Sequence, residues 1–107
     1  MDKKELVEQY KNREQTGGVI VIKNALIGKW HIDSAPDLKA AKNRFEFFGS
    51  SNMKVSNDFT AQKGEGFSFE VLEELKKGEN RSDKEFREDL SVLKAIWLEK
   101  LAGQDMY

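Results

Sequence analysis

The chain has 107 residues, of which 35% are charged and 38% hydrophobic, and its formal net charge is −1 at neutral pH. This length predicts one domain over residues 1–107 with a single small core, and the absence of cysteine excludes disulfides, thiolate metal sites and cysteine nucleophiles. No apolar run is long enough for a membrane span, and the charged N-terminus lacks the apolar core of a signal peptide. We therefore expect a cytoplasmic protein without a membrane partner.

The N-terminal part of the chain predicts a helix followed by a β-hairpin. Residues 2–13 have the composition of a short helix that Asp2 can cap, and a pair of glycines then breaks it. The β-branched run at residues 19–24 favours a buried strand over a helix. A turn at 24–28 leads to a returning strand at 29–34, which completes the hairpin.

A second helix, a short ambiguous segment and a third strand follow the hairpin. Ser34 and Pro36 are expected to start the helix, with the proline near the first helical position. Its buried stripe consists of apolar residues at helical spacing: Leu38, Ala41, Phe45 and Phe48. Residues 54–66 fit either a short helix or a loop. The alternating stretch at 67–75 predicts the third strand.

The last predicted element is a long amphipathic helix. Ser82 and Glu85 have the spacing of a capping box at its start. One of its faces carries a continuous apolar stripe: Phe86, Leu90, Leu93, Trp97 and Leu101. The order of elements predicts an α+β fold with a small three-stranded antiparallel sheet flanked by helices.

Several motifs resemble the GIY-YIG nuclease family. The triplets Gly18-Val19-Ile20 and His31-Ile32-Asp33 stand at the spacing of the two family triplets, and "SAPDLKAAKNRFEF" is similar to the helix that follows them. "FSFEVLEEL" resembles the third family strand, and "LKAIWLEKL" resembles the end of the last helix. The resemblance covers nearly the whole chain. It implies a compact, single-domain, GIY-YIG-like member of the family with DNA as a partner.

The resemblance also implies a catalytic site, because phosphodiester cleavage needs an activated water, a base and positive charge on the phosphate. In this family a tyrosine helps to activate the water, an arginine on the helix after the hairpin steadies the phosphate, and a glutamate on the last helix holds a divalent metal. Mg²⁺ is accordingly the cofactor expected for active members.

This chain departs from the family at both triplets. Ile20 stands at the first tyrosine position, and its aliphatic side chain has no proton to exchange. His31 stands at the second, where an imidazole can act as a general base near neutral pH. A lone histidine on a strand nevertheless also fits a structural role. Asp33 replaces the final glycine of the second triplet, and its negative charge would repel a nearby phosphate.

The arginine and metal positions have changed as well. The expected arginine falls at Ala41, while Arg44 lies one turn later and can extend back toward the same phosphate. Lys94 occupies the metal position three residues before Trp97, and an ammonium cannot ligate Mg²⁺. We therefore expect a degenerate active site with no metal ligand, in which His31 and Arg44 are the remaining catalytic candidates.

A mildly basic stretch between residues 20 and 45 provides candidate nucleic-acid contacts, although it also fits an ordinary solvated face. The candidates are Lys23, Lys29, Lys39, Lys42, Arg44 and Lys94. Residues 61–107 are net acidic. Two hypotheses follow: a catalytically impaired, endonuclease-like protein that retains DNA binding, or a pseudoenzyme that binds protein and has no role with nucleic acid.

Overall fold

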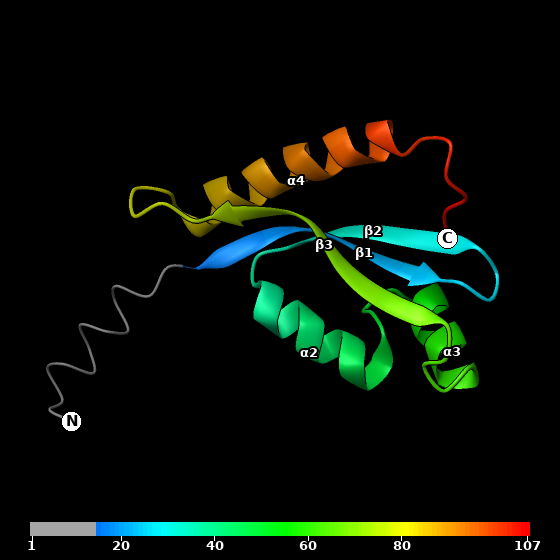
Figure 1. Cartoon of the computed structure of the whole chain (residues 1–107). Helices are drawn as coiled ribbons and strands as arrows, with labels where there is room; N and C mark the ends of the chain where they lie inside the picture. Colours follow the sequence, from blue (N-terminus) through cyan, green and yellow to red (C-terminus); the bar gives the residue numbers. More distant parts are fainter. Residues whose placement is uncertain (1–14) are drawn as a thin grey trace, which may run out of the picture.

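The computed structural model describes residues 15–107, so the helix predicted at residues 2–13 lies outside the described residues. Within these residues six elements follow one another: β1 (Thr16–Asn24), β2 (Lys29–Ala35), α2 (Leu38–Phe48), α3 (Met53–Ala61), β3 (Phe67–Lys76) and α4 (Asp83–Lys100). The strands form one antiparallel sheet in the order β2-β1-β3 (Figure 1). The predicted α+β fold with a three-stranded antiparallel sheet is confirmed.

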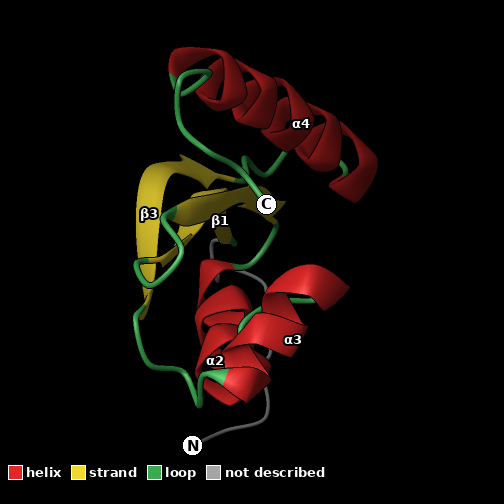
Figure 2. Ribbon diagram, turned by 90° about the vertical axis from the view of Figure 1, so that its right-hand side faces the viewer, coloured by secondary structure: helices red, strands yellow, loops and turns green. Residues whose placement is uncertain are grey.

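Helices cover both faces of the sheet. Figure 2 shows α4 on one side, with α2 and α3 together on the other. The central strand β1 supplies side chains to both layers, because successive side chains of a strand point to opposite faces. Val19 and Val21 pack in the α4 layer, and Ile20 and Ile22 pack in the layer of α2 and α3. All four are almost completely buried, as the sequence of β1 predicted.

The register of the β1–β2 hairpin determines which face each side chain of β2 occupies. Asp33 pairs with Ile20 and His31 pairs with Ile22, so both polar residues lie on the face of α2 and α3. Trp30 belongs to the α4 layer, where it packs around Ile32 and its neighbours. The tryptophan and the histidine therefore point to opposite faces, as neighbouring residues of a strand do.

Helix α2 begins later than the sequence indicated. Ser34 lies in β2, and Asp37 is the N-cap, where its carboxylate accepts hydrogen bonds from the backbone N–H groups of Lys39 and Ala40 at 3.0 and 3.2 Å. The expected start at Ser34 was therefore wrong, because strand pairing extends to Ala35. The buried stripe was also drawn too long, since Phe48 is 43% exposed.

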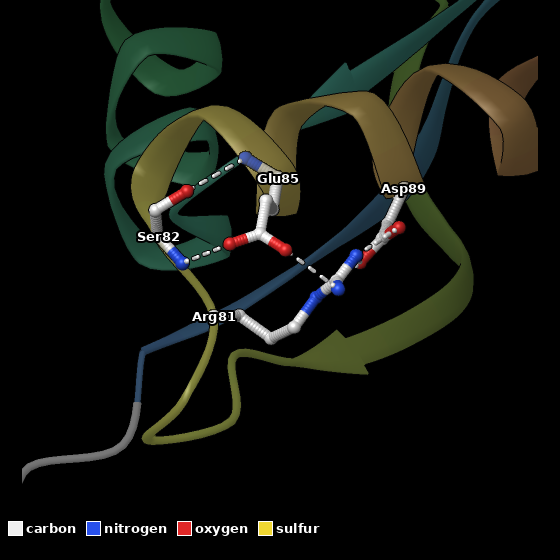
Figure 3. Close-up of polar contacts among 4 residues, drawn as sticks. All are labelled: Arg81, Ser82, Glu85 and Asp89. Carbon is white, nitrogen blue, oxygen red and sulfur yellow. Dashed lines mark hydrogen bonds and ion pairs between the residues drawn. The ribbon is translucent and has the colours of Figure 1, made fainter.

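The remaining helices begin at side-chain caps. Asn52 caps α3, and the ambiguous segment at 54–66 is resolved into the rest of this helix and a turn. Ser82 and Glu85 form the predicted capping box of α4. Arg81 adds two ion pairs beside it: Nη1 lies 2.9 Å from an oxygen of Glu85, and Nη2 lies 2.7 Å from an oxygen of Asp89 (Figure 3). These contacts fix the start of the longest helix.

A polar cluster ties the C-terminal residues to the hairpin. Asn24 is completely buried, and its Nδ2 donates to Gln62 Oε1 at 2.8 Å and to Tyr107 Oη at 2.7 Å. Gln62 returns a hydrogen bond to Asn24, and Tyr107 Oη donates to Asp58. Every partner in this cluster is thus satisfied.

Within the described part of the chain, no helix is long and apolar enough to cross a membrane.

Candidate functional site

A small hollow opens on the face of the sheet that α2 covers. Its wall combines strand, helix and loop residues: Ile20, Ile22, Asp33, Ser34, Ala35, Ala41, Arg44, Gly49, Ser50 and Ser51. Gly49 ends α2 with a φ of 82° and lets the chain turn back beside the strands. The hollow therefore gathers four of the positions that the sequence singled out: Ile20, Asp33, Ala41 and Arg44.

Asp33 is the polar centre of this site. Its Oδ1 accepts a hydrogen bond from the backbone N–H of Ser34 at 2.9 Å and lies 3.5 Å from Lys94 Nζ. Its Oδ2 lies 3.8 Å from His31 Nε2, which is too long for a hydrogen bond. Since β2 is an outer strand, Lys94 reaches this carboxylate from α4, past the edge of the sheet.

The surroundings of Asp33 favour its charged form. Burial of the carboxyl group opposes ionisation, but His31, the backbone N–H of Ser34 and the Lys94 ammonium outweigh it and lower the pKa of Asp33 below its ordinary value. The site therefore contains a stable negative charge where an approaching phosphate would meet repulsion, and Lys94 is the cation that offsets it.

His31 lies next to Asp33 but does not line the hollow, so it is poorly placed for proton transfer to a substrate there. Its side chain is only 16% exposed. Nε2 is buried and has no hydrogen-bond partner in the described residues. The nearest carboxylate is that of Asp33 on the same strand. A mostly buried imidazole of this kind fits a structural role. The sequence had left both a structural and a catalytic role open for His31.

Arg44 lines the same hollow as Ala41, the position at which the motif alignment expects an arginine. Ala41 is buried against the sheet, whereas Arg44 is exposed, and both border the same hollow. The long side chain of Arg44, one turn further along α2, can therefore extend toward the surface next to Ala41. In the described part of the chain Arg44 forms no ion pair with an acidic residue.

The residues present do not fit the divalent metal that the resemblance implies. Lys94 stands at the expected ligand position, and its ammonium lies beside the nearest carboxylate, that of Asp33. A cation there repels a metal ion and takes up the negative charge that would attract one. Across residues 15–107, no group of three or more histidine, aspartate or glutamate side chains is arranged to hold a metal.

The other basic candidates do not share one surface. Lys23 lies in the α4 layer, where it pairs with Glu70 at 2.9 Å and stacks over Trp30 at 4.3 Å from the ring centroid. Lys39 and Lys42 are exposed on α2. At 100° per residue, Lys42 is about 160° around this helix from Arg44. Lys29 begins β2 next to the hairpin turn. Of these basic candidates, Arg44 alone lines the hollow, and Lys94 contacts one of its lining residues, Asp33.

The loop between α2 and α3 supplies site residues that the sequence did not single out. Gly49, Ser50 and Ser51 line the hollow, and Ser50 is buried, with its Oγ accepting a hydrogen bond from the backbone N–H of Asn52 at 3.1 Å. In the sequence these residues had only the signal of a helix end. The Asp33–Lys94 pair was missed for a different reason: its members are 61 residues apart.

Comparison with known proteins identifies the fold. No family model matches the sequence, and no curated protein matches it. Among solved structures, a mutant of the catalytic domain of intron endonuclease I-TevI aligns with a TM-score of 0.54 at 23% identity, over 81% of this chain and 84% of that domain. A second structure, of the catalytic domain of homing endonuclease I-TevI, gives a TM-score of 0.46 at 23% identity, over 80% of this chain and 88% of that one.

The chain therefore has a GIY-YIG-like fold, as the motifs predicted. The alignment spans most of both chains. At 23% identity the likeness concerns the arrangement of the elements. What the site does has to be argued from its own residues.

Proposed function

We propose that this protein binds DNA through the surface around the hollow and has lost phosphodiester cleavage. The observation that carries the proposal is the Asp33–Lys94 pair, at 3.5 Å between Oδ1 and Nζ. By the motif alignment, one member stands in place of a glycine and the other in place of the metal-binding glutamate. The two side chains carry opposite charges and neutralise each other, which supports a site that keeps its structure without a metal.

The absence of cleavage follows from what the hollow lacks. Ile20 presents only methyl and methylene groups where the family has a tyrosine, so it cannot activate a water. The Nε2 of His31 is buried beside Asp33. With Lys94 at the metal position, no group on this surface both activates a water and stabilises the negative charge that develops on the leaving oxygen.

DNA binding needs less from the site than cleavage does. Arg44 is exposed at the rim of the hollow, and an arginine guanidinium matches a phosphate through paired N–H donors. Lys94 offsets the charge of Asp33, so a phosphate at the rim meets a balanced carboxylate. The fold shared with an endonuclease catalytic domain supports DNA as the polymer that this surface meets.

The experiment is fluorescence-anisotropy binding of labelled linear and branched DNA at low salt, with and without Mg²⁺, alongside a plasmid-nicking assay. We expect affinity that does not depend on Mg²⁺ and that falls steeply with salt, because phosphate contacts release counterions. We expect no nicking. Metal-dependent nicking that disappears on His31→Gln or Arg44→Gln would instead establish an active nuclease.

A protein-interaction module without a nucleic-acid role is the second candidate. It is favoured by the charge pairing of Lys23 with Glu70 and of Lys94 with Asp33, which leaves less free positive charge than the sequence implied. The outer side of α4 also exposes apolar side chains, with Val92 at 62% and Ile96 at 43%. This candidate predicts no DNA affinity at any salt concentration.

A further inference from the structure

Two exposed phenylalanines flank the arginine at the rim of the hollow. Phe47 is 82% exposed and Phe48 is 43% exposed. They follow Arg44 by three and four residues on α2, so each ring neighbours the arginine side chain on the helix surface. Water contact with two aromatic rings is unfavourable. Nothing in the described residues covers the Phe47 ring, so this side chain is not part of the hydrophobic core.

These rings adjoin a polar surface suited to a phosphate. Arg44 borders the hollow together with Ser50 and Ser51 of the following loop. Residues 38–61 contain four basic and two acidic residues, and of the four basic ones Arg44 is the one that lines the hollow. One of the two acidic residues, Asp58, accepts a hydrogen bond from Tyr107. The surface therefore combines positive charge, hydroxyl groups and aromatic rings on one helix and its adjoining loop.

We propose that the end of α2 binds a single-stranded segment of DNA, with its unpaired bases stacked on Phe47 and Phe48 and a phosphate held by Arg44. Rings that stack on bases, next to a cation that tracks the backbone, are the elements by which proteins bind single strands without reading sequence. In a duplex the bases are paired inside the helix, and these rings have no base face to contact. The inference rests on the proposed DNA binding and specifies which form of DNA is bound.

The charge of the surface argues for nucleic acid over an apolar protein partner. Arg44 forms no ion pair within residues 15–107, and its spacing on α2 makes it a neighbour of each ring. An apolar partner docking there would cover the guanidinium and strip it of water without supplying a counter-charge. A nucleotide offers a phosphate and a planar base together.

The test compares anisotropy binding of a labelled single strand and of the matching duplex across a set of variants. Phe47→Ala should weaken single-strand binding about tenfold, the usual effect of losing one stacked base, and should change duplex binding much less. Phe47→Leu keeps apolar volume but has no ring, so it should lose most of the same affinity. Phe47→Trp should restore it. Val92→Ala is the matched control, because it removes an exposed apolar side chain from the other face of the sheet.

The outcomes separate this inference from the function on which it rests. If the unmodified protein binds neither form of DNA, the proposed function fails. If it binds DNA and Phe47→Ala leaves single-strand affinity unchanged, only the stacking surface is overturned. Sedimentation of each variant tests whether a second copy of the chain covers the rings instead. If the unmodified protein is a dimer that Phe47→Ala dissociates without changing DNA affinity, the rings are a contact between copies and the inference is overturned.

Discussion

Ile20 and Asp33 stand opposite each other in the β1–β2 pair, and both line the hollow. An aliphatic side chain and a carboxylate thus face each other at two positions where the family motif has a tyrosine and a glycine. The carboxylate is held by a lysine from the last helix. This arrangement makes the site a charge-balanced polar surface, and the balance can be altered one residue at a time.

Lys94→Glu should convert the site into one that responds to divalent metal. The change places a second carboxylate beside Asp33 and removes the ammonium, so two like charges repel each other in the absence of metal. We expect a lower melting temperature in a chelator and a recovery on adding Mg²⁺ or Mn²⁺. Thermal unfolding followed by circular dichroism measures both.

The unmodified protein and Lys94→Gln serve as controls for this experiment, and neither should respond to the metal. The glutamine variant loses the cation without adding a ligand, so it separates loss of the ion pair from gain of a metal site. Equal metal responses in all three proteins would show that the ions act elsewhere on the chain.

Asp33→Asn should flatten the dependence of stability on acidic pH. The folded-state pKa of Asp33 is lowered, so its contribution to stability is present above the unfolded-state pKa and is lost as pH falls through the folded-state value. Because Asp33 and Lys94 are each about a third exposed, solvent screening keeps the effect small, of the order of 1 kcal/mol or less.

Urea unfolding at neutral pH and at stepwise lower pH measures this contribution. The unmodified protein should lose stability below about pH 4, the region of an ordinary aspartate pKa, and Asp33→Asn should lose less over the same interval. Asp83 and Glu85 also have lowered pKa values, so part of the slope remains in the variant. Identical slopes in the two proteins would contradict the role given to Asp33.

Asn24→Ala should destabilise the fold more than the substitution of an exposed polar residue by alanine. Asn24 is completely buried, and its loss removes the hydrogen bonds that it exchanges with Gln62 and the one that it donates to Tyr107, which leaves the acceptor Oε1 of Gln62 without its donor. Unpaired buried polar groups cost about 1–3 kcal/mol each. Urea unfolding gives the free energy of unfolding directly. Asn43→Ala, at an exposed position of α2, is the matched control and should change it little; an equal loss in both would refute the importance of the cluster.

The strands and the last helix could be predicted from the sequence because their signals are local. The β-branched run of β1 and the capping box at Ser82 each depend on residues close together in the chain. The predicted start of α2 was wrong for a physical reason. Ser34 and Asp37 are both good N-cap residues, and only the pairing of β2 with β1 determines that the strand continues past Ser34.

The site could be predicted only in part. The motif alignment brought Ile20, Asp33 and Arg44 to attention, and the hollow does unite them. It could not show that Lys94 pairs with Asp33, because that contact depends on how α4 lies along the outer strand. The motif alignment also could not show that Lys23 and Arg44 lie on opposite sides of the sheet. The side on which a strand residue lies depends on how the strands pair.

Arg44→Gln tests which of the basic residues contacts DNA. Loss of one phosphate contact should weaken binding of all sequences alike and reduce the slope of log affinity against log salt by about one. Arg87→Gln is the matched control, because Arg87 is an exposed arginine on α4, on the other side of the sheet. Anisotropy titrations at several salt concentrations give the slopes. The hollow is the DNA-contacting surface only if Arg44→Gln changes the slope and Arg87→Gln does not; equal changes would indicate diffuse attraction to the whole molecule, and no change in either would remove Arg44 from the proposed interface.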